Sequence, residues 1–359
     1  MRHSLPPTRQ SKRKRFLGVE GLEDRLTPAA PFPEFIDPNP NPGNQFGEKV
    51  VALSTGNVVI TSPFDDFAAA DAGAVYLFNG ATGALISTLR GSTANDNVGI
   101  DGVTALTNGN YVVRSSVWDN GAVVNAGAAT FGSGTTGISG AVSAANSLVG
   151  TTANDLVGIG SGGVTALTNG NYVVGSLNWD NGAVADAGAA TFGSGTTGIS
   201  GAVSAANSLV GTTANDSVGD SVTALTNGNY VVRSPDWDNG AVADAGAATF
   251  GSGTTGISGA VSAANSLVGT TANDFVGISD GVTALTNGNY VVRSAFWDNG
   301  AVVDVGAATF GSGTTGISGA VSAANSLVGS TAGDQRRLRR RDGPDQRQLR
   351  GQQCELGQR

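Results

Sequence analysis

The sequence predicts an all-β protein built as a β-propeller-like array of four-stranded antiparallel blades. Three observations support this fold class. A unit of about sixty residues recurs with little change along the chain. Each unit carries an Asn-Gly hairpin signal between two β-branched runs. Glycine accounts for 55 of 359 residues beside a hydrophobic fraction of 40%, which favours a folded core with many turns over a disordered chain.

The repeat is defined by three segments that recur within this one chain. VTALTNGNYVV occurs at 103–113, 164–174, 222–232 and 282–292, and WDNGAV follows each copy. GAATFGSGTTGISGAVSAANSLVG is unchanged from 127–150 to 306–329. Length differences between units cluster in the short stretch after Asn-Asp, which indicates a surface loop there.

Each unit contains four predicted strands. VTAL and YVVRS flank the Thr-Asn-Gly-Asn turn and form a hairpin, because both turn residues of Asn-Gly tolerate positive φ. GAATFG is the third strand and ISGAVSAANSLVG contains the fourth. The tyrosine that follows each turn is expected to make cross-strand contacts. Residues 46–94 follow the same order and form a divergent first blade, with AVYLF and ALISTLRG as its third and fourth strands.

The predicted organisation is therefore linear. A basic export-type segment at 1–30 and a proline-rich linker at 31–45 precede blades at 46–94, 95–153, 154–214, 215–272 and 273–332. A β-solenoid is the alternative architecture, because identical glycine-rich repeats also stack in a line. The length of the WDNGAVADAG turn favours blades. Five blades fit a closed ring or an interrupted larger one.

These segments resemble the FG-GAP repeats of integrin-type propellers. Phe46-Gly47 opens the first blade, VVALSTGNVVITSP makes its first hairpin, and DAGAVYLF is its third strand. Later blades have Val-Gly in place of Phe-Gly. Over about 46–332 the chain is also similar to a bacterial repeat family of unknown function with a VTAL-NGNYVV-S-WDNG core. The resemblance implies a propeller and does not identify a ligand.

The N-terminal segment suggests export. Residues 1–15 are basic, and the acidic residues Glu20, Glu23 and Asp24 interrupt what would be the apolar region of a signal peptide. The pattern instead resembles the LEPR-type N-terminal motif of large bacterial surface proteins, with Asp24 where proline is usual. This resemblance implies a bacterial extracellular or cell-surface location. A solvated arm is the alternative interpretation.

Charge and composition exclude several functions. Residues 46–332 hold five basic residues against nineteen acidic ones, so these repeats repel phosphate backbones and no nucleic-acid partner is expected. The only histidine, His3, and the only cysteine, Cys354, lie in the terminal segments. That arrangement excludes a disulfide framework, Cys/His zinc sites and Ser-His-Asp or Cys-His catalysis. No apolar run of about eighteen residues predicts a membrane span.

Two sets of residues are candidate sites. Carboxylates in the glycine-rich loop after each tryptophan could bind Ca²⁺ through oxygen, although Asn125 replaces one of them and an Asx-turn is the alternative. One aromatic residue per blade could stack on sugars, or could pack between blades. The candidate metal ligands are Asp180, Asp186, Asp238, Asp244, Asp298 and Asp304, and the candidate binding residues are Trp118, Trp179, Trp237 and Trp297.

The expected function is that of a non-catalytic scaffold. Identical carboxylates would form equivalent sites, whereas a glycosidase needs two carboxylates in different environments, so no enzyme activity and no cofactor are expected. Repeated faces favour a structural or adhesion role with weak, multivalent contacts to a protein or polysaccharide. A calcium-dependent or carbohydrate-binding module is the alternative, and a truncated gene product without function is the third interpretation.

The segment 333–359 departs from the repeat. After SLVGSTAGD the chain becomes QRRLRRRDGPDQRQLRGQQCELGQR, where earlier units continue to another hairpin. One permitted set of codons for 335–359, read one base later, encodes SVGSGGVTALTNGNYVVSSVSWDN. We therefore predict a frameshifted, disordered tail, an unpartnered face on the fifth blade, and self-association of the chain through that face.

Overall fold

The computed structural model describes residues 34–159, 162–278 and 281–332. In these ranges the chain is all-β, with turns between strands and no helix. No helix of the described residues is long and apolar enough to cross a membrane. The expected segment at 1–30 and the predicted tail from 333 lie outside the described residues.

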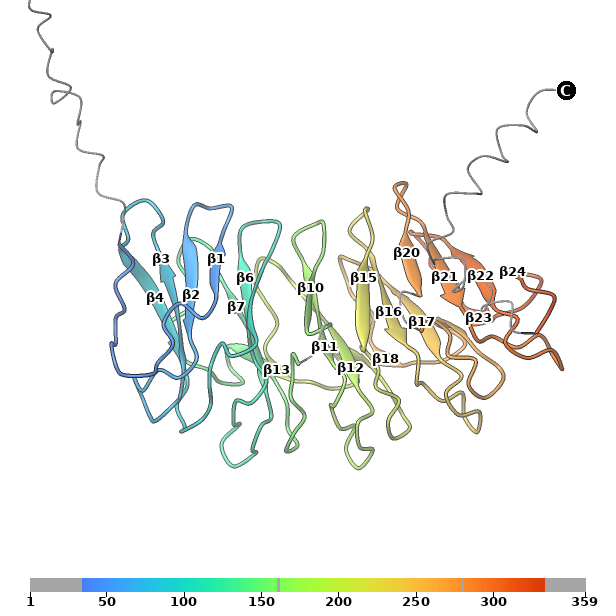
Figure 1. Ribbon diagram of the computed structural model, residues 1–359, viewed down its shortest axis with the longest axis horizontal. Coiled ribbons are helices and arrows are strands. Elements are labelled where there is room, and N and C mark those ends of the chain that lie inside the picture. Colours follow the sequence, from blue (N-terminus) through green and yellow to red (C-terminus); the bar gives the residue numbers. More distant parts are fainter. Residues whose placement is uncertain (1–33, 160–161, 279–280, 333–359) are drawn as a thin grey trace, which may run out of the picture.

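Five sheets form, one for each predicted unit (Figure 1). In the first sheet the strands are β1 (Val50–Ala52), β2 (Val58–Ser62), β3 (Ala74–Phe78) and β4 (Leu85–Arg90). In the second they are β5 (Gly102–Ala105), β6 (Tyr111–Ser115), β7 (Ala128–Gly132) and β9 (Ser147–Val149). In the third they are β10 (Val164–Ala166), β11 (Tyr172–Ser176), β12 (Ala189–Gly193) and β14 (Ser208–Val210).

The last two sheets repeat this order. The fourth contains β15 (Ser221–Ala224), β16 (Tyr230–Ser234), β17 (Ala247–Gly251) and β19 (Ser266–Val268). The fifth contains β20 (Val282–Ala284), β21 (Tyr290–Ser294), β22 (Ala307–Gly311) and β24 (Ser326–Val328). Within every sheet these four strands pair antiparallel in chain order, which confirms the four-stranded antiparallel unit.

The first hairpin of each unit forms where the Asn-Gly signal predicts it. In the second sheet, Val103 pairs with Val113 and Ala105 with Tyr111. Gly109 takes a φ of 89°, so the turn needs a residue that enters the left-handed region freely. Tyr111 pairs directly with Gly132 on the next strand, where the glycine leaves room for the tyrosine ring, so the expected cross-strand contact is present.

One strand prediction needs a correction. The run ISGAVSAANSLVG is not a single fourth strand, because it forms two strands that join different sheets. The second of them, for example β9, completes its own sheet. The first is a Gly-Ala pair that crosses to the preceding sheet and pairs parallel there: β8 (Gly140–Ala141), β13 (Gly201–Ala202), β18 (Gly259–Ala260) and β23 (Gly319–Ala320). Four sheets thereby gain a fifth strand from the next unit.

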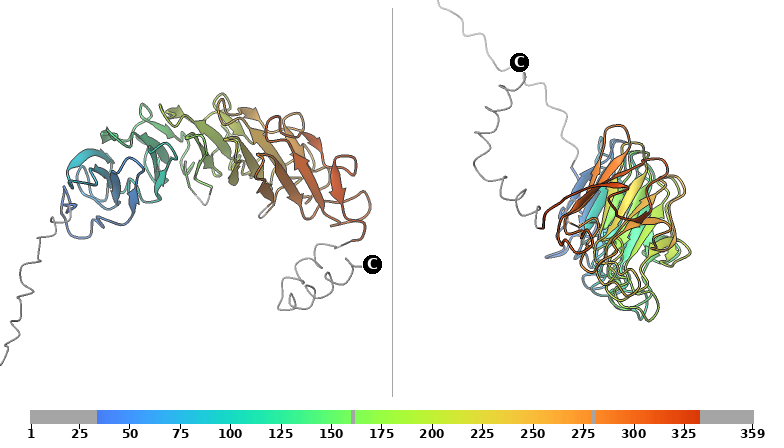
Figure 2. Two further views of the ribbon diagram at one scale, coloured as in Figure 1. Left: turned by 90° about the horizontal axis from the view of Figure 1, so that it is seen from above. Right: turned by 90° about the vertical axis from the view of Figure 1, so that its right-hand side faces the viewer.

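The five sheets lie in a curved row (Figures 1 and 2). The first and fifth sheets lie at opposite ends of this row in Figure 1 and in the left view of Figure 2. The first strands of neighbouring sheets, such as β5 and β10, contact one another along the row. The described residues thus form a repeat array of four- and five-stranded sheets.

The hydrophobic core lies between adjacent sheets. Because side chains alternate along a strand, each sheet has one apolar face toward each neighbour. On β6, Val112 packs with residues of the third sheet, whereas Tyr111 and Val113 pack with residues of the first. At the N-terminal end, Phe35 and Phe46 cover the outer face of the first sheet, with ring centroids 5.5 Å and 6.1 Å from that of Phe78.

Candidate functional site

The candidate metal ligands lie in the loop that connects the second and third strands of each unit. In the third unit, the Asp180 carboxylate accepts a hydrogen bond from the Asp186 backbone N–H at 2.9 Å. Asp186 has a φ of 49°, a conformation that Asp and Asn adopt more readily than other side chains. The same bond forms from Asp244 to Asp238 and from Asp304 to Asp298, each at 2.8 Å. Each of these carboxylates accepts a backbone N–H six residues on and so closes the whole loop, a longer span than the two residues of an Asx-turn.

The loop with asparagine is built in the same way. Asn125 donates its backbone N–H to the Asp119 carboxylate at 2.8 Å and has a φ of 52°. An asparagine therefore substitutes for the aspartate without change of loop geometry. Within the described residues, no group of three or more His, Cys, Asp or Glu side chains is arranged to bind a metal.

Calcium is expected to leave the thermal stability of the chain unchanged. In each of these loops the first Asp carboxylate already accepts a backbone N–H, and the few carboxylate oxygens of the loop fall short of the six to eight oxygen ligands of a Ca²⁺ site. The measurement is the melting temperature with about 1 mM CaCl₂ and with excess EDTA. This calcium concentration is high enough to load the weak sites of extracellular proteins. A melting temperature that rises with CaCl₂ and falls with EDTA would contradict this expectation.

The four tryptophans are buried. Trp118 is 3% exposed, and Trp179, Trp237 and Trp297 are each 4% exposed. Trp237 belongs to a cluster that contains Leu167 and Leu209 of the third sheet with Tyr230 of the fourth. The tryptophan rings thus pack between sheets, which is the alternative to sugar stacking, and their faces are not presented to solvent.

A set of buried aspartates was missed at the sequence level. These residues end the Thr-Thr-Ala-Asn-Asp segment, or Ser-Thr-Ala-Asn-Asp in the first unit, and each is 0% exposed: Asp96, Asp155, Asp216 and Asp274. In Asp216, Oδ2 accepts the backbone N–H groups of Thr212 and Thr213 at 2.8 Å each. Its Oδ1 accepts the backbone N–H of Asp238, in the loop after the second strand of the fourth sheet, at 2.9 Å. One carboxylate therefore joins the segment that follows the last strand of the third sheet to a loop of the fourth sheet.

The signal for these residues was present in the sequence. Charged residues make up only 13% of the chain, yet the same aspartate recurs at the end of a constant segment. Gly211 fits the same turn, because a Cβ at that position would lie 2.7 Å from the Cβ of Asp216. The length differences after Asn-Asp predicted a surface loop there and gave the aspartate itself no role, whereas it fixes the start of that loop.

Burial raises the pKa of each of these four carboxyl groups above the ordinary value of 3.8. The backbone N–H groups that donate to the carboxylates act in the opposite direction, because they stabilise the charged form. The carboxyl of the next loop lies close by and adds a smaller repulsive effect, as Asp238 does for Asp216. The balance leaves the pKa raised.

The melting temperature is expected to rise as the pH falls from 7 toward 4. A carboxyl with a raised pKa in the folded state binds protons more tightly there than in the unfolded chain. Its stabilising contribution is complete below about 3.8 and is lost as the pH rises through the raised folded pKa. Because asparagine does not titrate, Asp216→Asn should make the melting temperature depend less steeply on pH. A melting temperature that rises steadily with pH over this range would contradict the expectation.

The loops also form one exposed edge of the array. In each loop the two residues after Asp-Asn are exposed, as Gly121 and Ala122 are in the second unit. Val124 and Val303 add exposed apolar side chains, each 53% exposed. The loop is closed by reciprocal backbone hydrogen bonds between Asn120 and Val123 at 2.9 and 3.1 Å. We name this surface, residues 119–125, 180–186, 238–244 and 298–304, the loop edge.

The opposite edge carries the Thr-Asn-Gly-Asn turns. Asn108 and Asn110 each donate from Nδ2 to the carbonyl oxygen of Gly195 in the next unit at 2.7 Å. The same pair of bonds forms from Asn169 and Asn171 and from Asn227 and Asn229. On this edge the polar side chains join neighbouring units.

Comparison with known families identifies the repeat. A family model described as a repeat of unknown function, DUF5650, matches residues 52–100, 105–159, 166–220, 224–278 and 284–337. Each match covers the second, third and last antiparallel strands of one sheet, and the divergent first unit is included. No curated protein matches the chain.

Proposed function

Because the chain belongs to the DUF5650 family of repeats, we propose a function that derives from repetition: a non-catalytic scaffold whose loop edge makes multivalent contacts. The ligand class is a protein or a polysaccharide at the bacterial cell surface. One observation carries the proposal: four loops have the same internal hydrogen bonds and present the same exposed Gly-Ala tip. A rigid loop loses little conformational entropy on binding, and repetition multiplies a weak contact.

The chemistry of the loop edge fits a broad, flat ligand. Its exposed tips are Gly-Ala, and half-buried carboxylates such as Asp180 lie beneath them. Small tips allow close approach of an extended chain. The repeats are acidic as a whole, so a neutral polysaccharide or a basic protein segment fits better than a polyanion.

The finer architecture that this proposal assumes is the propeller blade. Four antiparallel strands in chain order support it, since a solenoid coil contributes single strands to long parallel sheets. The parallel pairing of the Gly-Ala strand with the preceding unit is the one feature that also fits a solenoid. An FG-GAP-type blade and an export-type N-terminal segment remain parts of the proposal, as does a cell-surface location. Protease treatment of intact cells, followed by detection of the chain, tests the location.

The loop edge is tested with charge substitutions at its exposed tips. The variants are Ala122→Lys, Ala183→Lys, Ala241→Lys and Ala301→Lys, introduced singly and together. The full chain and these variants are passed over peptidoglycan, cellulose and chitin, and over beads that carry a basic protein. Retention should fall with each added lysine, and by about 100-fold or more when all four are present, because avidity depends on the number of loops.

Matched controls separate the loop edge from overall charge. Thr136→Lys, Thr197→Lys, Thr255→Lys and Thr315→Lys place the same charges on exposed residues beside the opposite edge. These variants should keep the retention of the unaltered chain. Equal losses in both sets, or no retention of the unaltered chain on any of the four materials, would contradict the proposal.

A further inference from the structure

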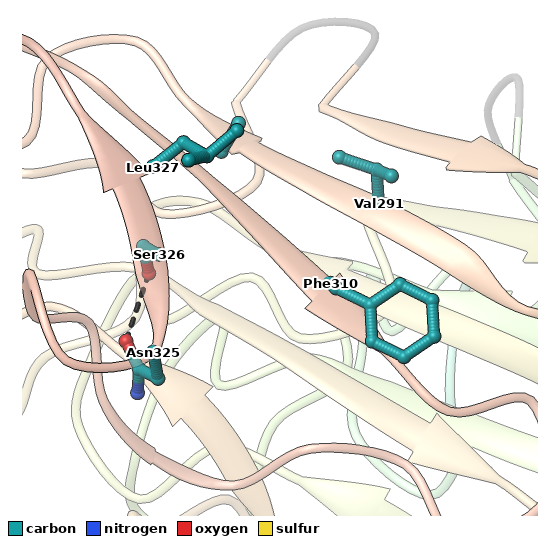
Figure 3. Close-up of a pocket in the computed structure, with 6 residues that line it drawn as sticks. Val291, Phe310, Asn325, Ser326 and Leu327 are labelled. Carbon is teal, nitrogen blue, oxygen red and sulfur yellow. Dashed lines mark hydrogen bonds between the residues drawn. The ribbon is translucent and has the colours of Figure 1, made fainter.

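The outer face of the fifth sheet is the largest departure from the repeat pattern. Leu327 is 83% exposed, whereas Leu148, Leu209 and Leu267 at the same position are 0% exposed. Phe310 is 55% exposed, whereas its counterparts Phe131, Phe192 and Phe250 are partly buried. With Val291 and Ala308 these side chains line an open apolar pocket of about 340 Å³ (Figure 3). We name this surface the terminal face.

In the other units the equivalent face is covered by the next unit. Phe131 stacks on Tyr172 with ring centroids 6.4 Å apart, and Phe250 stacks on Tyr290 at 6.5 Å. Leu267 pairs with Gly319, which lies on the parallel strand β23 of the following unit. The terminal face therefore offers the same contacts as one side of the other junctions: a phenylalanine on which a tyrosine stacks and a strand with which a Gly-Ala strand pairs.

The polar half of the same junction is also open. Asn227 and Asn229 donate from Nδ2 to Gly313 of the next unit, at 2.6 and 2.7 Å. The Nδ2 groups of Asn287 and Asn289, the counterparts in the fifth unit, donate to no acceptor among the residues that the structure describes. Both the apolar and the polar contacts of a junction are therefore missing at the outer side of the fifth sheet, and one further unit would supply both.

A head-to-tail second copy does not fit this face. Such a copy would have to offer the outer face of its first sheet, which Phe35 and Phe46 cover. The surface that matches the terminal face is that of one further repeat unit. One permitted set of codons for 335–359, read one base later, gives VTALTNGNYVV and a Trp-Asp-Asn, and this repeat would supply the tyrosine that stacks on Phe310.

We propose that the terminal face is a docking surface for one further repeat of the same kind, joined directly to the fifth unit. This inference concerns the junction between units and does not depend on the loop edge. The occupant pairs a Gly-Ala strand with Leu327 and Val328, as Gly319 and Ala320 pair with Leu267 and Val268. It also places its tyrosine on Phe310.

Thiol labelling tests the proposal. Leu327→Cys is placed in the full chain with Cys354→Ser, which removes the only native thiol. A second chain carries the same change, with residues 335–359 replaced by SVGSGGVTALTNGNYVVSSVSWDN followed by a copy of residues 182–211. The new thiol should react with a disulfide reagent roughly 100-fold more slowly in the extended chain, because reaction then requires local opening of the junction.

A matched thiol controls for folding. Leu267→Cys occupies the same position in the fourth unit and should be protected in both chains. Equal reaction rates at position 327 in the two chains, with position 267 protected, would overturn the proposal. So would protection at position 327 that grows with concentration in the unextended chain, since a second copy would then be the occupant. The gene gives a separate test: native codons that do not encode this repeat one base later would exclude it as the occupant.

Discussion

Replacing Trp237 with alanine is expected to lower the free energy of unfolding by about 3–5 kcal/mol. The ring is 4% exposed and packs between the third and fourth sheets, so its removal leaves a cavity in a junction. Its loss should weaken one junction and spare the others, because units in a repeat array contact only their neighbours. Urea unfolding followed by circular dichroism, with hydrogen exchange to locate the effect, measures the change.

Two variants control for this result. In the part of the chain that the structure describes, the indole N–H of Trp237 donates to no acceptor. Trp237→Phe should therefore cost clearly less than Trp237→Ala. Phe310→Ala removes a large aromatic side chain that is 55% exposed and should cost less than about 1 kcal/mol. A change within about 0.5 kcal/mol for Trp237→Ala would show that the ring is exposed in solution and would restore the sugar-stacking interpretation.

Asp216→Ala is expected to have an effect of similar size, about 3–5 kcal/mol. Its carboxylate accepts three backbone N–H groups, and the side chain is 0% exposed. Alanine would leave all three donors without an acceptor in a place that water reaches poorly, and each such donor costs about 1–3 kcal/mol. The measurement is the same urea unfolding experiment.

The asparagine variant distinguishes the hydrogen bonds from the charge. Asp216→Asn keeps one acceptor oxygen and loses the charge, so it should cost less than Asp216→Ala. Asp66→Ala changes an exposed aspartate and should have little effect beyond the loss of its bonds from the Asp71 backbone and the Asn41 side chain. Equal stability of Asp216→Ala and the unaltered chain would mean that the turn closes without its carboxylate.

Much of the fold could be predicted from the sequence because its signals are local. Asn-Gly fixes the hairpin between β5 and β6, and alternation along β6 sends Tyr111 and Val112 to opposite junctions. The Gly-Ala strands could not be predicted, because their partner lies in the preceding unit and two small residues carry no periodicity. Sequence similarity between units reveals that a strand recurs but not which sheet receives it.

The candidate site was predicted less well than the fold. The loop aspartates lie in one loop, but the hydrogen bond that joins them spans six residues, whereas the Asx-turn alternative implies a two-residue span. Asp216 and its counterparts were missed because a charged residue is ordinarily assigned to the surface, whereas three backbone donors allow this one to be buried. Whether a buried carboxylate is satisfied depends in part on a backbone group more than twenty residues along the chain, and residue type alone does not show that.

The crossing Gly-Ala strands also determine how the array bears mechanical load. Because the first and last described sheets lie at opposite ends of the row, tension applied between them passes through the junctions in series. Each of the four junctions is held by a parallel strand pair from the following unit, and all four pairs have the same register. Links of equal strength in series yield one at a time. A chain anchored at one end and pulled at the other would therefore extend stepwise and absorb work at each step.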